Sequence, residues 1–128
     1  MKDFNELEVW RKAKDLVILI YQFARQFPKE ELYGLADQLK RAGNSICANI
    51  AEGFSRYHPK DKIKFYYNAR GSISECKSHV YIAAELKYIS QDNVKKLIVE
   101  YDVVGKMLNS MINSLNRIHS SRSSLPNP

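Results

Sequence analysis

The stretch LADQLKRAGNSICANIAEG, residues 35–53, gives the clearest indication of how this chain folds. Its apolar residues recur at spacings of three and four, which places them on one face of an α-helix. These residues are Leu35, Leu39, Ala42, Ile46 and Ile50. Small residues between them would let a second helix approach closely. The pattern predicts an amphipathic helix that packs against other helices.

Two helix-breaking residues suggest where this helix begins and ends. Pro28 suits the first turn of a helix, where its missing N–H costs no hydrogen bond, and Glu30 and Glu31 would lie near the positive end. Gly53 is a suitable C-terminal cap, because glycine adopts the left-handed backbone conformation without steric cost. We therefore expect the helix to begin at Pro28 and to end at Gly53.

The same spacing of apolar residues recurs on both sides of this segment. It predicts three further helices, at about residues 5–26, 59–88 and 92–119. Phe27-Pro28, a loop at residues 54–59 and a turn at Ser90–Asp92 separate the four helices. No stretch alternates with period two over a useful length, so the sequence does not predict strands.

Four helices joined by short loops imply a simple topology. Helices of about 20 to 30 residues are about 30 to 45 Å long, and short connections make sequence neighbours antiparallel. We expect an all-α fold, an antiparallel up-down-up-down four-helix bundle formed by residues 1–119. Residues 120–128 are polar and are expected to form a disordered tail.

The charge of the chain is concentrated in its middle third. The net charge is +6, and residues 40–77 contain eight basic and three acidic side chains. A basic balance favours polyanionic partners such as RNA, DNA or an acidic protein face. Arg56, Lys60, Lys62 and Lys64 cluster near Tyr57 and His58, and Arg41 is a further candidate for binding nucleic acid. The alternative is that these basic residues only form the solvent-exposed start of a helix and bind no partner.

Polar side chains in residues 41–53 suggest a buried network. Ser45 and Asn49 are four residues apart and share a helix face beside the apolar stripe. A buried Asn49 would need hydrogen-bond partners, and Arg41, Glu52 and Glu75 are the candidates. We interpret this group as a structural network that fixes helix register. A ligand pocket between the helices is the alternative.

The sequence contains none of the usual signatures of an active site. Glu75 and His79 share a helix face, but one such pair supplies too few ligands for a metal ion. No Walker loop, nucleophile elbow or other catalytic motif is present. We expect no enzymatic activity, no metal and no cofactor.

The cysteines and the N-terminal residues indicate in which cellular compartment the protein is expected. Cys47 and Cys76 fall within helical patterns and are expected to act as small hydrophobic residues in a reducing cytoplasm. The N-terminal residues lack the apolar stretch of a signal peptide, and no apolar run is long enough to span a bilayer. We expect a cytoplasmic protein with no membrane partner.

Several motifs along about residues 4–118 match a known family. They are Phe4, Leu7, Val9, Trp10, Ala13, Phe27, Pro28, residues 31–35, Gln38–Ala42, Ser45, Ile46, Asn49–Gly53, Ala69, Gly71, Ser72, Glu75 and residues 83–89. With these residues the sequence resembles the bacterial four-helix bundle family of 23S rRNA intervening-sequence proteins, also labelled S23 ribosomal proteins. It is also similar to the accessory variability determinant of diversity-generating retroelements.

The resemblance implies an antiparallel bundle that assembles into a barrel-like homopentamer. It also implies contact with nucleic acid, or with a reverse transcriptase in the retroelement branch. The sequence departs from the expected pattern at Cys76 and Lys77, and Lys87 lies where glycine is common.

Two hypotheses for the function follow. The first is a non-enzymatic, oligomeric and basic binding module associated with nucleic acid. The alternative is a protein-interaction scaffold that docks a partner such as a reverse transcriptase. Tyrosine is enriched at interfaces, and the candidates for such docking are Tyr33, Tyr57, Tyr66, Tyr67 and Tyr81.

Overall fold

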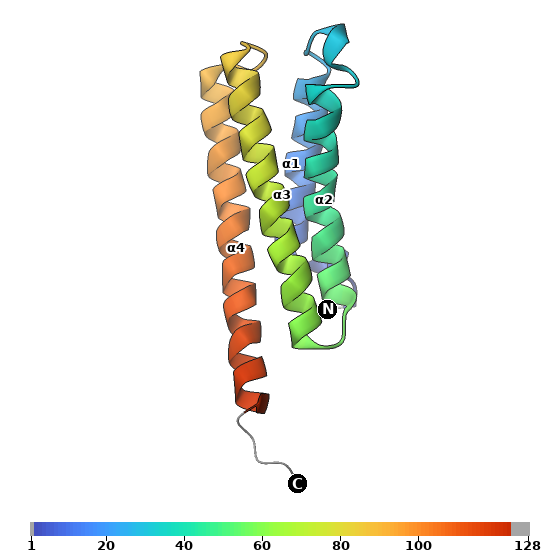
Figure 1. Cartoon of the computed structure of the whole chain (residues 1–128), viewed down its shortest axis with the longest axis vertical. Helices are drawn as coiled ribbons and strands as arrows, with labels where there is room; N and C mark the ends of the chain where they lie inside the picture. Colours follow the sequence, from blue (N-terminus) through green and yellow to red (C-terminus); the bar gives the residue numbers. More distant parts are fainter. Residues whose placement is uncertain (1, 124–128) are drawn as a thin grey trace.

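The computed structural model describes residues 2–123, and every regular element in that range is helical. The elements are η1 (Phe4–Glu6), α1 (Glu8–Ala24), η2 (Lys29–Glu31), α2 (Leu35–Ser55), α3 (Pro59–Glu85) and α4 (Gln91–Ser123). The four long helices run antiparallel along the chain (Figure 1). The predicted all-α fold, an up-down-up-down four-helix bundle, is confirmed.

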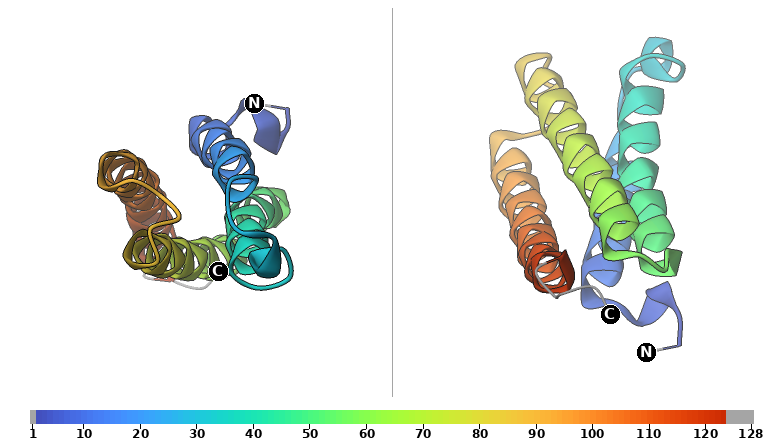
Figure 2. Two further views of the ribbon diagram at one scale, coloured as in Figure 1. Left: turned by 90° about the horizontal axis from the view of Figure 1, so that it is seen from above. Right: turned by 60° about the horizontal axis from the view of Figure 1, so that its bottom comes forward.

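The helices follow one another around the bundle axis. Each packs against its sequence neighbours, and α4 also contacts α1 (Figure 2). The α1–α2 and α3–α4 connections lie at one end, and the α2–α3 loop lies at the other (Figure 1). Short loops produce this order because they make consecutive helices antiparallel neighbours, and the contact between α1 and α4 closes the bundle.

The start of α2 differs from the prediction. The helix begins at Leu35, whereas Pro28 precedes only the short 3₁₀ helix η2. Gly34 separates the two, because its φ of −106° and ψ of −116° are outside the helical region. Proline is compatible with the start of either kind of helix, and Pro28 marks the start of η2 rather than that of α2.

The predicted role of Gly53 is also wrong. α2 continues through Gly53 to Ser55, and no described glycine has a positive φ. Gly53 lies instead against the ring of the buried Tyr66, whose Cε1 would be 2.5 Å from a Cβ at position 53. Similarly, a Cβ at Gly43 would be 2.8 Å from Cγ2 of Val17, where α1 crosses α2. Both glycines allow close packing within the bundle.

α3 ends in a left-handed residue that is not glycine. Lys87 has φ of 65°, and its N–H donates to the carbonyl of Ala84 at 2.9 Å. The N–H of Tyr88 donates to the carbonyl of Ala83 at 2.9 Å, which completes a Schellman motif. The helix therefore ends at Glu85 rather than at Tyr88. A glycine would adopt this φ without steric cost, which explains why glycine is expected at position 87.

The core extends along the whole bundle. Its largest fully buried side chains are Tyr101, Ile20, Leu39, Ile46, Ile50, Leu97, Leu108, Val80, Val104 and Cys76. Burying each large aliphatic side chain contributes about 1.5 to 3 kcal/mol to folding. At the end formed by the α1–α2 and α3–α4 connections, the rings of Phe27 and Tyr88 pack with centroids 5.2 Å apart.

The last helix is longer than predicted. α4 continues past His119 to Ser123, and its carboxyl end extends beyond the α2–α3 loop (Figure 1). The remainder of the expected disordered tail, residues 124–128, lies outside the described residues. None of the described helices is both long and apolar enough to cross a membrane.

Candidate nucleic-acid interface

The α2–α3 loop places several charged and aromatic side chains at one end of the bundle. Arg56 follows α2, His58 precedes α3, and Pro59 begins α3. Tyr57 is 86% exposed and its ring contacts the His58 imidazole edge-on, with centroids 5.0 Å apart. We call this region, formed by Arg56, Tyr57, His58, Lys60 and Lys64, the basic end surface.

Lys60 and Lys64 are the free cations of the basic end surface. Both side chains are exposed and, being four residues apart on α3, share one helix face. Neither forms an ion pair with any carboxylate in the part of the chain that the structure describes. Their charges are therefore available to an external anion.

Lys62 has a structural contact instead. Its Nζ donates to the main-chain oxygens of Phe54 at 2.7 Å and Gly53 at 3.3 Å, near the carboxyl end of α2. Nζ also lies 5.6 Å from the ring centroid of Phe54. Partial burial of the ammonium lowers the pKa of Lys62. This predicted nucleic-acid ligand therefore caps helix α2 in the folded chain.

Lys62→Met is expected to lower the free energy of unfolding by about 1 kcal/mol, because the last carbonyls of α2 lose a charged donor while the aliphatic stem is retained. Lys64→Met is the matched control and should change stability by less than about 0.5 kcal/mol, since Lys64 is exposed and unpaired. Urea unfolding monitored by circular dichroism measures both. Equal losses in the two variants would rule out the capping role of Lys62.

The two predicted arginine ligands are already engaged within the chain. Arg56 Nε lies 3.4 Å from Oε2 of Glu52, and its guanidinium lies 4.7 Å from the ring centroid of Phe65. Arg41 Nε donates to Oδ2 of Asp37 at 2.8 Å. Arg41 precedes Arg56 by about four helical turns, or about 22 Å along α2, so the structure does not bring it to the basic end surface.

The polar network is smaller than predicted and includes a residue that the sequence did not suggest. Asn49 Nδ2 donates to the carbonyl of Ser45 at 2.9 Å and lies 3.1 Å from its Oγ. The hydroxyl of buried Ser72, on α3, lies 2.8 Å from Ser45 Oγ and joins α2 to α3. Ser72 could have been suggested by its place on the inward stripe of α3, between Ala69 and Cys76.

The charged candidates lie outside this network. Arg41 pairs with Asp37, and Glu52 pairs with Arg56, each along one face of α2. Glu75 is exposed and lines a shallow pocket between α2 and α3 together with Arg41 and His79. The hydrogen bonds among the Ser45 and Ser72 hydroxyls and the Asn49 amide involve no charged side chain. Arg41, Glu52 and Glu75 are therefore not part of the network.

The two thiols and the hydroxyl of Tyr101 all have raised pKa values. Burial raises the pKa of Cys47 to about 11 and that of Cys76 to about 12. Burial also raises the pKa of Tyr101. These groups are protonated at neutral pH, and a thiol is a weak nucleophile compared with its thiolate. Within the described chain, no three His, Cys, Asp or Glu side chains lie close enough together to hold a metal ion.

The tyrosines divide between the core and the surface. Tyr33 is 90% exposed, and Tyr67 and Tyr81 are half exposed. Tyr66 is only 3% exposed, and burial raises its pKa to about 12. Its expected role in docking is therefore wrong for the folded chain, because its ring fills the space above Gly53.

The fold and the sequence both have counterparts among known proteins. The fold is similar to the crystal structure of a protein of unknown function from the S23 ribosomal protein family, from Bacteroides thetaiotaomicron VPI-5482. The TM-score is 0.76 at 22% identity, over 82% of this chain and 95% of that chain. No curated protein matches the chain significantly. The family model of the 23S rRNA-intervening sequence proteins matches residues 5–110, and the chain therefore belongs to this family.

Proposed function

We propose that this chain is a non-enzymatic binding module that assembles into a homo-oligomer, a pentamer by resemblance, and associates with nucleic acid in the cytoplasm. The observation that carries the proposal is the pair of exposed, unpaired ammonium groups of Lys60 and Lys64. They lie beside Arg56 and the exposed ring of Tyr57 at one end of the bundle. Cations attract phosphates, and an exposed aromatic ring can stack on a base.

Oligomerisation would strengthen binding by this surface. A single protomer offers few phosphate contacts, and affinity from so few contacts is weak at physiological salt. Copies of the basic end surface held in one assembly would engage one polyanion together, which raises the apparent affinity without any new contact. The net charge of +6 per chain acts in the same direction, because it attracts polyanions from a distance.

Salt titration of the affinity for RNA tests this proposal. We expect a fluorescently labelled, structured RNA to bind with an affinity that falls at least about 20- to 40-fold between about 50 and 200 mM salt, the fall expected for about three phosphate contacts in the whole complex. Fluorescence anisotropy at several salt concentrations gives the slope. An affinity that does not change with salt, or no binding at the lowest salt, would contradict the proposal.

The alternative function is a protein-interaction scaffold that docks a partner such as a reverse transcriptase. Exposed apolar and aromatic side chains at the opposite end of the bundle favour it, namely Leu32, Tyr33, Ile82 and Leu86. Capture of the same protein from lysate before and after nuclease treatment would support this alternative. Loss of the captured protein after nuclease treatment would instead support nucleic-acid association.

A further inference from the structure

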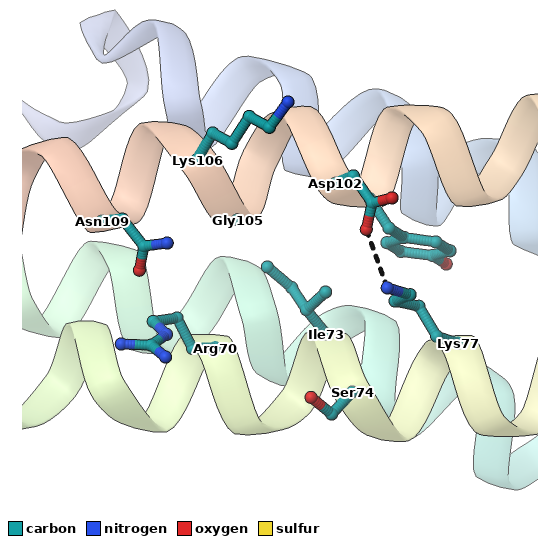
Figure 3. A pocket seen from close by; sticks show the side chains of 9 residues that line it. Arg70, Ile73, Ser74, Lys77, Asp102, Gly105, Lys106 and Asn109 are labelled. Carbon is teal, nitrogen blue, oxygen red and sulfur yellow. Dashed lines mark hydrogen bonds and ion pairs between the residues drawn. The ribbon is translucent and has the colours of Figure 1, made fainter.

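A groove between α3 and α4 has no role in the function proposed above. Its volume is about 310 Å³, and Arg70, Ser74 and Lys77 of α3 line one side. Asp102, Gly105, Lys106 and Asn109 of α4 line the other. Figure 3 shows Asn109 pointing across the groove toward α3, where the Arg70 guanidinium lies along its own helix, while Lys77 reaches Asp102 farther along the groove.

The groove carries more positive than negative charge. Lys77 Nζ lies 2.7 Å from Oδ1 of Asp102, so these two charges compensate each other. Arg70 and Lys106 have no carboxylate within ion-pair distance among the side chains that the structure describes. The Lys106 stem lines the groove while its ammonium extends along α4 (Figure 3). An uncompensated guanidinium beside the Asn109 amide is a set of donors that suits an anion with several oxygens.

Gly105 leaves the backbone of α4 uncovered where it lines the groove. A Cβ at this position would meet no atom within 4 Å, in contrast to Gly43 and Gly53, which are needed for packing. Glycine within a helix is less stable than alanine, so the folded chain gains nothing from Gly105 by itself. What glycine does provide is an open backbone that a bound group can approach closely.

An aromatic ring lies next to the cationic end of the groove. The guanidinium of Arg70 lies 5.3 Å from the ring centroid of Tyr67, and half of the Tyr67 side chain is exposed. Lys60, Lys64 and Tyr67 recur at spacings of four and three, so they share a face of α3. Lys64 and Arg70 are about 9 Å apart along the helix axis. Tyr67 therefore lies between Lys64 of the basic end surface and Arg70 of the groove along α3.

We propose that the α3–α4 groove binds a phosphodiester of a single-stranded nucleic acid. Arg70 and Asn109 donate hydrogen bonds to the phosphate oxygens above Gly105, and Tyr67 stacks on the adjacent base. Stacking on a side chain requires an unpaired base, which selects a single strand over a duplex. This inference rests on the proposed association with nucleic acid. It adds that the nucleic acid is single-stranded and that Arg70, Asn109 and Tyr67 recognise it.

A comparison of single-stranded with hairpin RNA tests the inference with the full-length chain. The probes are a short labelled oligouridylate and a labelled RNA hairpin, compared by fluorescence anisotropy at one low salt concentration. Arg70→Gln is expected to weaken binding of oligouridylate about tenfold, because a charged, bidentate contact to phosphate is lost. Arg70→Lys should not restore the affinity, since an ammonium lacks the planar pair of donors. Lys95→Gln removes an exposed charge near the start of α4, outside the groove, and should have little effect.

Gly105→Ala is the second variant, and it should stabilise the fold while weakening binding. The melting temperature should rise, because alanine favours the helix and its Cβ meets no atom, while binding of oligouridylate should weaken. If wild type binds oligouridylate and both Arg70→Gln and Gly105→Ala bind it equally well, the groove is not the site, although association with nucleic acid stands. If wild type binds neither probe, the groove inference and the proposed function both fail.

Discussion

Gly53→Ala is expected to lower the free energy of unfolding by about 2 kcal/mol, the cost of forcing an extra methyl group into a filled core. The new Cβ would lie 2.5 Å from Cε1 and 2.9 Å from Cδ1 of Tyr66. The Tyr66 ring is buried, so it cannot move into solvent to relieve the clash. The gain of about 1 kcal/mol in helix propensity is smaller than this cost. Urea unfolding at equilibrium measures the change.

Gly71→Ala is the matched control, because Gly71 also lies within a long helix. A Cβ there meets no atom within 4 Å, so the same substitution should raise the free energy of unfolding by about 1 kcal/mol. Combining Gly53→Ala with Tyr66→Leu should cost less than the sum of the two single changes, because a smaller side chain leaves room for the methyl group. The same sign of change in both glycine variants would contradict the packing described for Tyr66.

The double variant Lys60→Glu/Lys64→Glu is expected to weaken binding of structured RNA about 100-fold at low salt, because two attractions to phosphate become repulsions. Both side chains are exposed and unpaired, so the fold should be unaffected. Fluorescence anisotropy measures the affinity, and far-ultraviolet circular dichroism verifies the helix content.

Lys95→Glu/Lys96→Glu is the control for this experiment. It makes the same change in net charge, but on exposed residues near the start of α4, at the opposite end of the bundle. We expect a much smaller loss of affinity. Equal losses of affinity in the two double variants would mean that only the overall charge matters. Undiminished binding by Lys60→Glu/Lys64→Glu would show that the basic end surface does not bind RNA.

Apolar spacing predicted the fold well, because a bundle of long amphipathic helices depends mainly on that spacing. The helix ends were less predictable. Pro28 and Gly53 are residues typical of helix ends, but Pro28 precedes η2 rather than α2, and Gly53 lies inside α2. Gly53 lies inside α2 because the Tyr66 ring, from another helix, occupies the space where its side chain would be.

The candidate site was predicted only in part. Composition located the basic residues near the α2–α3 loop, but it could not separate Lys62, which caps α2, from the free Lys60 and Lys64. Tyr66 is three residues before Ala69 on the inward stripe of α3, so helical spacing could have assigned it to the core and Tyr67 to the surface. The residues that line the α3–α4 groove come together only through the register in which the two helices pack. A sequence pattern within one helix does not determine that register.

Charge-dependent binding of nucleic acid by an oligomer of this chain is the property to be measured first. Size-exclusion chromatography with light scattering tests it most directly, with and without a short structured RNA, at low and at high salt. We expect one stable oligomer that takes up RNA at low salt and releases it at high salt. A monomer under all conditions, or an oligomer that ignores RNA at low salt, would contradict it.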